Sequence, residues 1–129
     1  MKLNLMKAVS LIVVLGVWAT ASADTSYREV WVCKIKEGKE MDDVRAANSK
    51  WVKFVRANVD KGISSHILTN VVGNATVGNF LYVDEFPSLE VWTTAKSALE
   101  GNKEGEAIDA ELAEVAECSE NSLAEAEDS

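Results

Sequence analysis

Apolar positions in the first half of the chain change from the spacing of a strand to the spacing of a helix. The segment 28–36 is rich in β-branched and aromatic side chains and precedes Gly38, which predicts a strand. From Met41 onward, apolar residues recur at intervals of three, four and seven, which is the stripe of an amphipathic helix. Gly62 ends that stripe, so we expect one strand followed by one long helix.

The second half of the chain repeats the change. Residues 63–72 and 79–85 return to strand composition on either side of a turn rich in glycine and asparagine. Pro87 opens a helical stretch, which Gly101 and Asn102 interrupt, and helical spacing resumes near residue 106. A weak strand signal follows over residues 118–124. The expected order is strand, helix, strand, strand, helix, strand.

This order predicts an α+β fold of the ferredoxin-like β-α-β-β-α-β type, a four-stranded antiparallel sheet with helices on one face. The first strand is apolar on both sides, with Trp31 and Cys33 on one side and Val30 and Val32 on the other. A sheet with helices on one face alone would then expose apolar side chains. The simplest cover is a second copy in a symmetric homodimer, and the pattern does not say which face forms it.

The arrangement resembles the dimeric α/β-barrel superfamily, which includes antibiotic-biosynthesis monooxygenases, EthD-like proteins and stress-responsive proteins. The resemblance is carried by residues 30–35, the loop Glu37-Gly38-Lys39 and the segment Phe86-Pro87-Ser88-Leu89-Glu90-Val91-Trp92. It implies ferredoxin-like protomers that pack sheet against sheet, with ligands bound between helix and sheet. A fold resemblance of this kind does not imply one particular chemistry.

The N-terminal segment 1–23 has the parts of an export signal. Lys2 and Lys7 precede an apolar run too short to span a bilayer comfortably, and small residues lead to Ala23. We expect cleavage after Ala23, with an uncleaved N-terminal anchor as the alternative. The mature chain would then be one domain over 24–124 with an acidic, frayed tail over 125–129, located in the periplasm or secreted.

Net charge narrows the range of partners. The leader contains two lysines and no acid, so its removal changes the formal net charge from −8 to −10. A chain this acidic repels nucleic acid and anionic membrane surfaces, because Lys and Arg drive binding to both. We therefore expect neither as a partner of the mature protein.

Two cysteines remain after cleavage, Cys33 and Cys118. An exported chain permits a disulfide between them, closing a loop of 85 residues and worth about 4.5 kcal/mol if unstrained. A redox pair is the alternative, although no Cys-x-x-Cys motif is present. With His66 as the one histidine, four zinc ligands are not available, and we expect neither a metal nor a cofactor.

His66 is the one side chain with an unperturbed pKa near neutrality, so it is the candidate catalytic acid or base. The alternative is a hydrogen-bonded structural histidine on the sheet. No partner that would orient its ring is evident from the sequence.

Asn48 interrupts the apolar stripe of the first helix, and a polar group facing a core needs a hydrogen-bond partner. We expect it to line a ligand pocket between helix and sheet or, alternatively, to bond to a nearby loop. Trp31, Trp51, Tyr82 and Trp92 are candidates for the same pocket, and plain core packing is the alternative for these aromatic residues.

Three functions remain open at this point. The leading hypothesis is an exported homodimer that binds a small apolar or aromatic molecule. A metal-free, monooxygenase-like enzyme acting on an aromatic substrate is the second, and a protein-interaction module using the open sheet face is the third. The sequence does not decide whether the protein is an enzyme.

Overall fold

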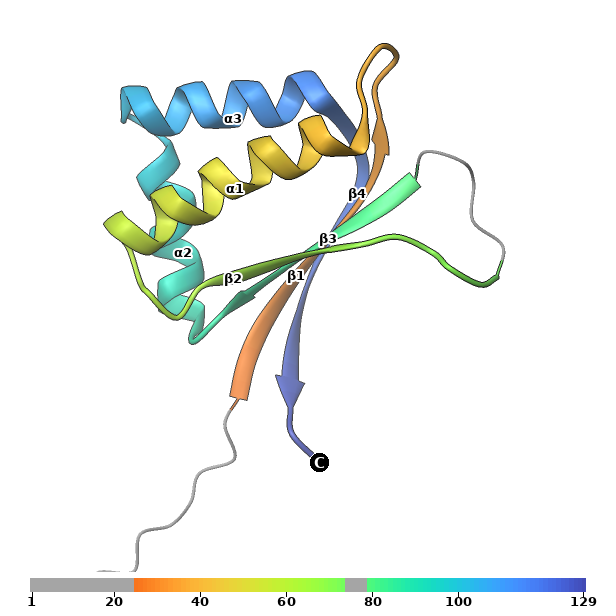
Figure 1. Ribbon diagram of the computed structural model, residues 1–129. Coiled ribbons are helices and arrows are strands. Elements are labelled where there is room, and N and C mark those ends of the chain that lie inside the picture. Colours follow the sequence, from red (N-terminus) through yellow and green to blue (C-terminus); the bar gives the residue numbers. More distant parts are fainter. Residues whose placement is uncertain (1–24, 74–78) are drawn as a thin grey trace, which may run out of the picture.

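The computed structural model describes residues 25–73 and 79–129, so the expected signal peptide at 1–23 lies outside the described residues. The elements, in chain order (Figure 1), are β1 (Thr25–Ile35), α1 (Met41–Asn58), β2 (Ser64–Leu68), β3 (Asn79–Phe86), α2 (Leu89–Leu99), α3 (Lys103–Val115) and β4 (Ala116–Glu127). The interruption at Gly101 and Asn102 separates α2 from α3, and the Asn102 side chain caps α3 by accepting from two backbone N–H groups.

The four strands form one antiparallel sheet in the order β2-β3-β1-β4. Both central strands are the ones with apolar residues on each side, β1 and β3, and Val30 lies opposite Val83 between them. The two β-α-β halves are therefore interleaved as in a ferredoxin-like domain. This confirms the α+β fold class predicted from the sequence.

The last strand differs from its predicted bounds. β4 runs from Ala116 to Glu127 and pairs with β1 as far as Thr25, so residues 125–127 are strand where a frayed tail was expected. The segment is rich in Ala, Glu and Ser, which have weak strand preference. The long edge of β1 supplies backbone partners along the whole segment, and this pairing overrides the local preference.

The three helices of residues 25–73 and 79–129 cover one face of the sheet, and none of them lies over the other face (Figure 1). Alternation along β3 places Phe80, Tyr82, Asp84 and Phe86 under the helices, where they are buried. Two clusters make up the core. One joins the Cys33 end of β1 to the start of α1 and the end of α3, and the other surrounds Trp51 and reaches α2.

Close contact between α2 and α3 depends on Gly105. A side-chain carbon at this position would lie 2.9 Å from the Cα of Leu99, closer than real contacts allow. The absence of a side chain therefore lets the first turn of α3 rest on the last turn of α2. This packing sets the positions of Leu99 and Leu112, which belong to the site described below.

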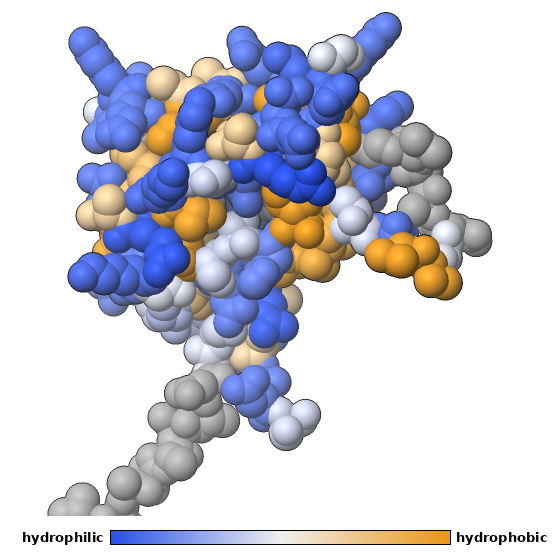
Figure 2. Space-filling view, in the orientation of Figure 1, coloured by the Kyte–Doolittle hydropathy of each residue, from blue (hydrophilic) through white to orange (hydrophobic). Residues whose placement is uncertain are grey.

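The uncovered face carries Val30 and Val32 from β1 and Leu81 and Val83 from β3, all half-buried. Beyond β2 the chain continues into an apolar end, where Val71 and Val72 are 94% and 91% exposed. Figure 2 shows this end as an orange protrusion, in contrast to the mainly polar surface over the helices. Among the described residues, no helix has the length and hydropathy needed to cross a membrane.

Candidate functional site

A cavity of about 280 Å³ lies between the sheet and the helices, at the junction of the two core clusters. Its aromatic lining consists of Trp31 from β1, Trp51 from α1 and Tyr82 from β3. Exposed residues of α3, Asp109 and Ala113, also line it, so the cavity opens to solvent beside that helix. Every element except β2 contributes a lining residue.

Four of the residues that the sequence indicated for a pocket line this one cavity, namely Asn48, Trp51, Trp31 and Tyr82. Trp92 does not line it. Its indole N–H instead donates to a carboxylate oxygen of Glu29 at 3.1 Å, beside the cavity. The polar interruption of the α1 stripe at Asn48 thus does mark the helix face that meets the cavity.

His66 lies on the opposite face of the sheet. It pairs with Val83 and is exposed, whereas its neighbour Ser65 points under the helices. Successive side chains of a strand point to opposite faces of the sheet. The side chain of Ser65 therefore lies on the cavity side of β2, and that of His66, one position later, lies on the open face. The structure thus places His66 outside the cavity, and its role as an acid or base stays a prediction, as does a structural role on the sheet.

Asp84 is the acid that sequence reasoning missed. It lines the cavity, is 6% exposed, and its Oδ1 has no hydrogen-bond partner in the structure. Burial raises the pKa of this carboxyl to about 6, and the nearby Glu29 carboxylate adds to the rise, whereas a Ser65 hydrogen bond and the Lys96 ammonium oppose it. Asp84 therefore changes protonation close to neutral pH.

Ser65 connects Asp84 to Asn48. Its hydroxyl oxygen accepts from Asn48 Nδ2 at 3.0 Å and lies 3.3 Å from Asn48 Oδ1, and the same hydroxyl is close enough to the Asp84 carboxyl to lower its pKa. A serine has a single proton to donate, so it serves Asn48 or Asp84 at a given moment. Ionised Asp84 would draw that proton, leaving the Asn48 amide as the donor to Ser65.

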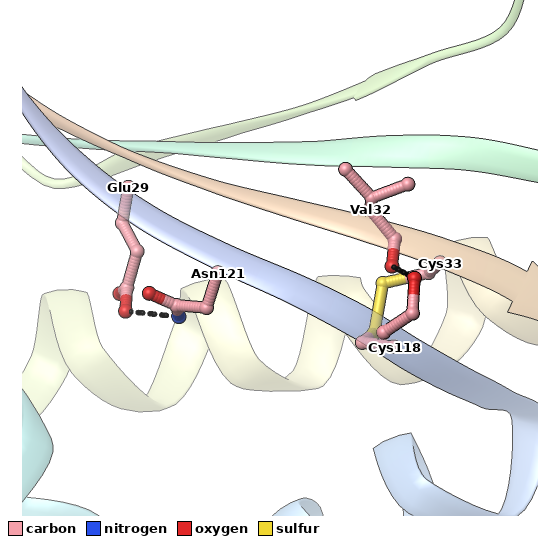
Figure 3. The surroundings of a disulfide bond; sticks show 6 residues. Glu29, Val32, Cys33, Cys118 and Asn121 are labelled. Atoms are coloured by element: carbon pink, nitrogen blue, oxygen red, sulfur yellow. Dashed lines mark hydrogen bonds between the residues drawn. A yellow bond between two sulfur atoms is a disulfide. The ribbon is translucent and has the colours of Figure 1, made fainter.

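A second buried carboxylate, Glu29, lies beside the cavity and is 2% exposed. It accepts from Lys96 Nζ at 2.6 Å, from Asn121 Nδ2 at 2.8 Å and from the Trp92 indole. Figure 3 shows Glu29 and Asn121 reaching towards each other from neighbouring strands. Fully paired in this way, Glu29 holds Lys96 in place, and the ammonium lies 5.0 Å from the centre of the Trp31 ring.

The hydroxyl of Tyr82 is the other unpartnered polar atom at the cavity. Tyr82 is buried, and its OH has no hydrogen-bond partner in the structure. Burial raises the pKa of this phenol to about 12, with a further contribution from the Asp84 charge, so the group remains a neutral donor. Native proteins rarely leave such buried atoms unpaired.

The sequence did contain a signal for both acids. Asp84 shares the strand register of Phe80, Tyr82 and Phe86, and Glu29 shares that of Trp31. An acid in the register of aromatic core residues is a buried acid if that register faces the helices. Reading every strand for charges among apolar residues would have listed both as candidates, without deciding which register faces the helices.

Cys33 and Cys118 form a disulfide between β1 and β4, with their Cα atoms 3.9 Å apart (Figure 3). They are cross-strand partners, and a register shift in the β1–β4 pairing lies next to them, between Val32 and Cys33. Cys118 also lines the cavity, so the covalent link fixes the edge strand at the wall of the site. In the part of the chain that the structure describes, no group of three or more His, Cys, Asp or Glu side chains could hold a metal ion.

Comparison with known protein families finds none that matches the sequence, and no curated protein matches it either. Solved structures do resemble the fold. SnoaB, a cofactor-independent oxygenase from Streptomyces nogalater, is 8% identical with a TM-score of 0.61, over 81% of this chain and 95% of that chain. A putative antibiotic biosynthesis monooxygenase from Caulobacter crescentus CB15 is 11% identical with a TM-score of 0.55, over 82% of this chain and 92% of that chain.

A NIPSNAP family protein of unknown function from Agrobacterium tumefaciens str. C58 is 10% identical with a TM-score of 0.58, over 79% of this chain and 88% of that chain. At such low identity these likenesses show the fold alone. The fold is therefore that of a ferredoxin-like α+β domain, and SnoaB and the putative monooxygenase share it.

Proposed function

We propose that the protein binds a small, largely apolar aromatic molecule in the cavity between the sheet and the helices. The observation that carries this proposal is the cavity of about 280 Å³ with Trp31, Trp51 and Tyr82 in its lining. Ligand sites are typically concave, apolar and provided with a few polar groups that orient the ligand. Asn48, Asp84 and Lys96 are such groups here.

Equilibrium dialysis of naphthalene against the purified protein tests the proposal, and we expect saturable binding at one site per chain. Ala113 lies on α3 at the cavity opening, so Ala113→Phe should fill the entrance and weaken binding at least tenfold. Ala110→Phe makes the same change on an exposed position of α3 outside the cavity and should leave the affinity unchanged. Absence of saturable binding, or equal loss in both variants, would contradict the proposal.

A second candidate function is oxygenation of an aromatic substrate without a metal or cofactor. Two observations favour it: the fold shared with SnoaB, which is a cofactor-independent oxygenase, and the buried carboxyl of Asp84 at the cavity wall. Oxygen uptake with 1,5-dihydroxynaphthalene, measured against the uncatalysed rate, tests this reading. We expect Asp84→Asn to abolish any acceleration, and equal uptake with and without protein would exclude it for this substrate.

We also propose that the open sheet face forms a homodimer. The support is the row of half-buried apolar side chains from β1 and β3 on a face without helices. Burying such a row against its own copy removes it from water on both subunits. A monomer mass by light scattering at micromolar concentration would exclude this interface and leave the face free for a different partner chain.

We infer that the protein works in the periplasm or outside the cell. The Cys33–Cys118 disulfide supports this location, since disulfides persist in oxidising compartments. N-terminal sequencing of the protein recovered from culture fractions would test both the location and cleavage after Ala23. Recovery of uncleaved protein from the cytoplasm would contradict it.

A further inference from the structure

Two side chains at the cavity wall, Tyr82 and Asp84, have hydrogen-bonding capacity that the protein itself leaves unused. Both residues line the cavity, and the Tyr82 hydroxyl and Asp84 Oδ1 are buried without a partner. They are two positions apart on β3, so their side chains leave the strand on the same face about 7 Å apart. A buried polar atom without a partner is unfavourable, and a ligand that enters the cavity is a source of partners.

We propose that Tyr82 and Asp84 form a paired hydrogen-bonding subsite, and that the ligand is a neutral aromatic compound bearing a hydroxyl group and an acceptor oxygen. This inference rests on the proposed function, because it names the ligand class of the same cavity. The ligand hydroxyl donates to Asp84 Oδ1, and the Tyr82 hydroxyl donates to the acceptor oxygen. The indole rings of Trp31 and Trp51 contact the aromatic scaffold.

The charges around the cavity exclude a carboxylate as the preferred ligand group. Asp84 and Asp109 line the cavity, and Glu29 lies buried beside it. Among the residues that the structure describes, Lys96 is the one cation in the lining, and Glu29 already binds it at 2.6 Å. An anionic ligand would meet unpaired acids and an engaged ammonium, whereas a neutral hydroxyl meets an acceptor.

The protonation state of Asp84 decides how strongly the hydroxyl is held. The titratable groups that face it are Glu29 from β1, Tyr82 from its own strand, Lys96 from α2 and, across the cavity, Asp109 from α3. From α1 and β2 it meets Asn48 and Ser65, which do not titrate in this range. Burial holds the pKa of Asp84 at about 6, so at pH 7.5 it is mainly a carboxylate and accepts from a hydroxyl.

Four probes of one ring system test the inference by equilibrium dialysis at pH 7.5: naphthalene, 2-methoxynaphthalene, 2-naphthol and 2-naphthoate. We expect 2-naphthol to bind the wild-type protein about tenfold more tightly than 2-methoxynaphthalene, because a hydrogen bond to a charged group contributes that much. We expect 2-naphthoate to bind more weakly than naphthalene. Equal affinity for 2-naphthol and 2-methoxynaphthalene, or tightest binding by 2-naphthoate, would overturn the inference.

Two shape-preserving variants assign the roles. Asp84→Asn should remove most of the preference for 2-naphthol over 2-methoxynaphthalene, and Tyr82→Phe should weaken both oxygen-bearing probes about fivefold. The affinity for naphthalene is measured in each variant as the reference, since this probe has no oxygen to bond to either residue. An unchanged preference for 2-naphthol in Asp84→Asn would contradict the assigned role of Asp84.

The probe series in the wild-type protein keeps the inference testable even if a variant does not fold. It also separates the two levels of the argument. If none of the four probes binds, the proposed ligand-binding function fails. If naphthalene binds and the hydroxyl adds nothing, the proposed function stands and the subsite of Tyr82 and Asp84 is excluded.

Discussion

The two faces of the sheet differ in where their charged and apolar side chains lie. A monomeric domain would bury apolar side chains and expose charged ones, and here both rules are broken. The face under the helices carries two buried acids, Glu29 and Asp84, among aromatic residues. The open face carries valines and leucines without a helix over them, such as Val32 and Val83. The helix-covered face thus buries charged groups within the core, and the open face exposes apolar side chains to water.

Both departures oppose the stability of an isolated chain, and this makes them informative. A buried carboxyl with an unpartnered oxygen destabilises the folded state unless something binds to it. An apolar face in water favours association. We therefore interpret the helix-covered face as the ligand side of the protein and the open face as its assembly side. Four changes would break or sharpen this contrast.

The largest expected effect comes from removing the disulfide on the ligand side. Replacing both Cys33 and Cys118 by Ala opens a loop of 85 residues and should lower the free energy of unfolding by about 4–5 kcal/mol. Urea denaturation measures the loss, and wild-type protein unfolded with reducing agent should show a similar one. A loss below about 1 kcal/mol would mean that packing alone holds β4 against β1.

Asp84→Asn should stabilise the protein in a pH-dependent manner. The Asp84 pKa is raised from 3.8 to about 6, so the folded state binds its proton more tightly than the unfolded state. That contribution is complete below about pH 4 and is lost as pH rises through 6, a decline of about 3 kcal/mol. The variant cannot ionise, so its advantage over wild type should grow to about that amount by pH 8.

Chemical denaturation between pH 4 and pH 8 follows this difference. Asp109→Asn provides a matched control, because Asp109 lines the same cavity but is exposed. The control should change stability by less than about 0.5 kcal/mol at every pH. A constant offset between Asp84→Asn and wild type across the range would show that ionisation of Asp84 does not oppose folding.

On the assembly side, Val83→Lys places a cation in the centre of the open face. If this face forms the homodimer, the charge is desolvated in the interface, and the dimer should dissociate at least tenfold more readily. Light scattering over a dilution series measures this shift. Ser97→Lys adds the same cation on an exposed position of α2 and should leave the mass unchanged. Equal masses for Val83→Lys and wild type would move the interface elsewhere.

His66→Ala should have the smallest effect. His66 is exposed on the open face and lies away from the cavity, so the affinity for 2-naphthol should remain within about twofold of wild type. The unfolding free energy should change by less than about 0.5 kcal/mol. A tenfold loss of affinity would restore His66 to the ligand site and weaken the contrast between the two faces.

The sequence alone determined the elements and much of the fold. Hydrophobic spacing distinguishes strand from helix locally, since each backbone conformation turns its side chains with its own period. The apolar residues on both sides of β1 predicted an apolar sheet face without helices, and the structure places β1 in the centre of the sheet. The polar interruption of a helical stripe at Asn48 indicated a cavity-facing position, because a period of 3.6 residues has a single inner face.

Only the tertiary structure decided which groups enter the site. A strand that is apolar on both sides gives no local indication of which side the helices cover, so Asp84 and Glu29 could not be assigned to the interior. For the same reason the sequence could not show that Ser65, and not His66, is the β2 residue that faces the cavity side. Long-range pairing also extended β4 beyond its local preference. Face and register are properties of the assembled sheet, and the helices that pack on it determine both.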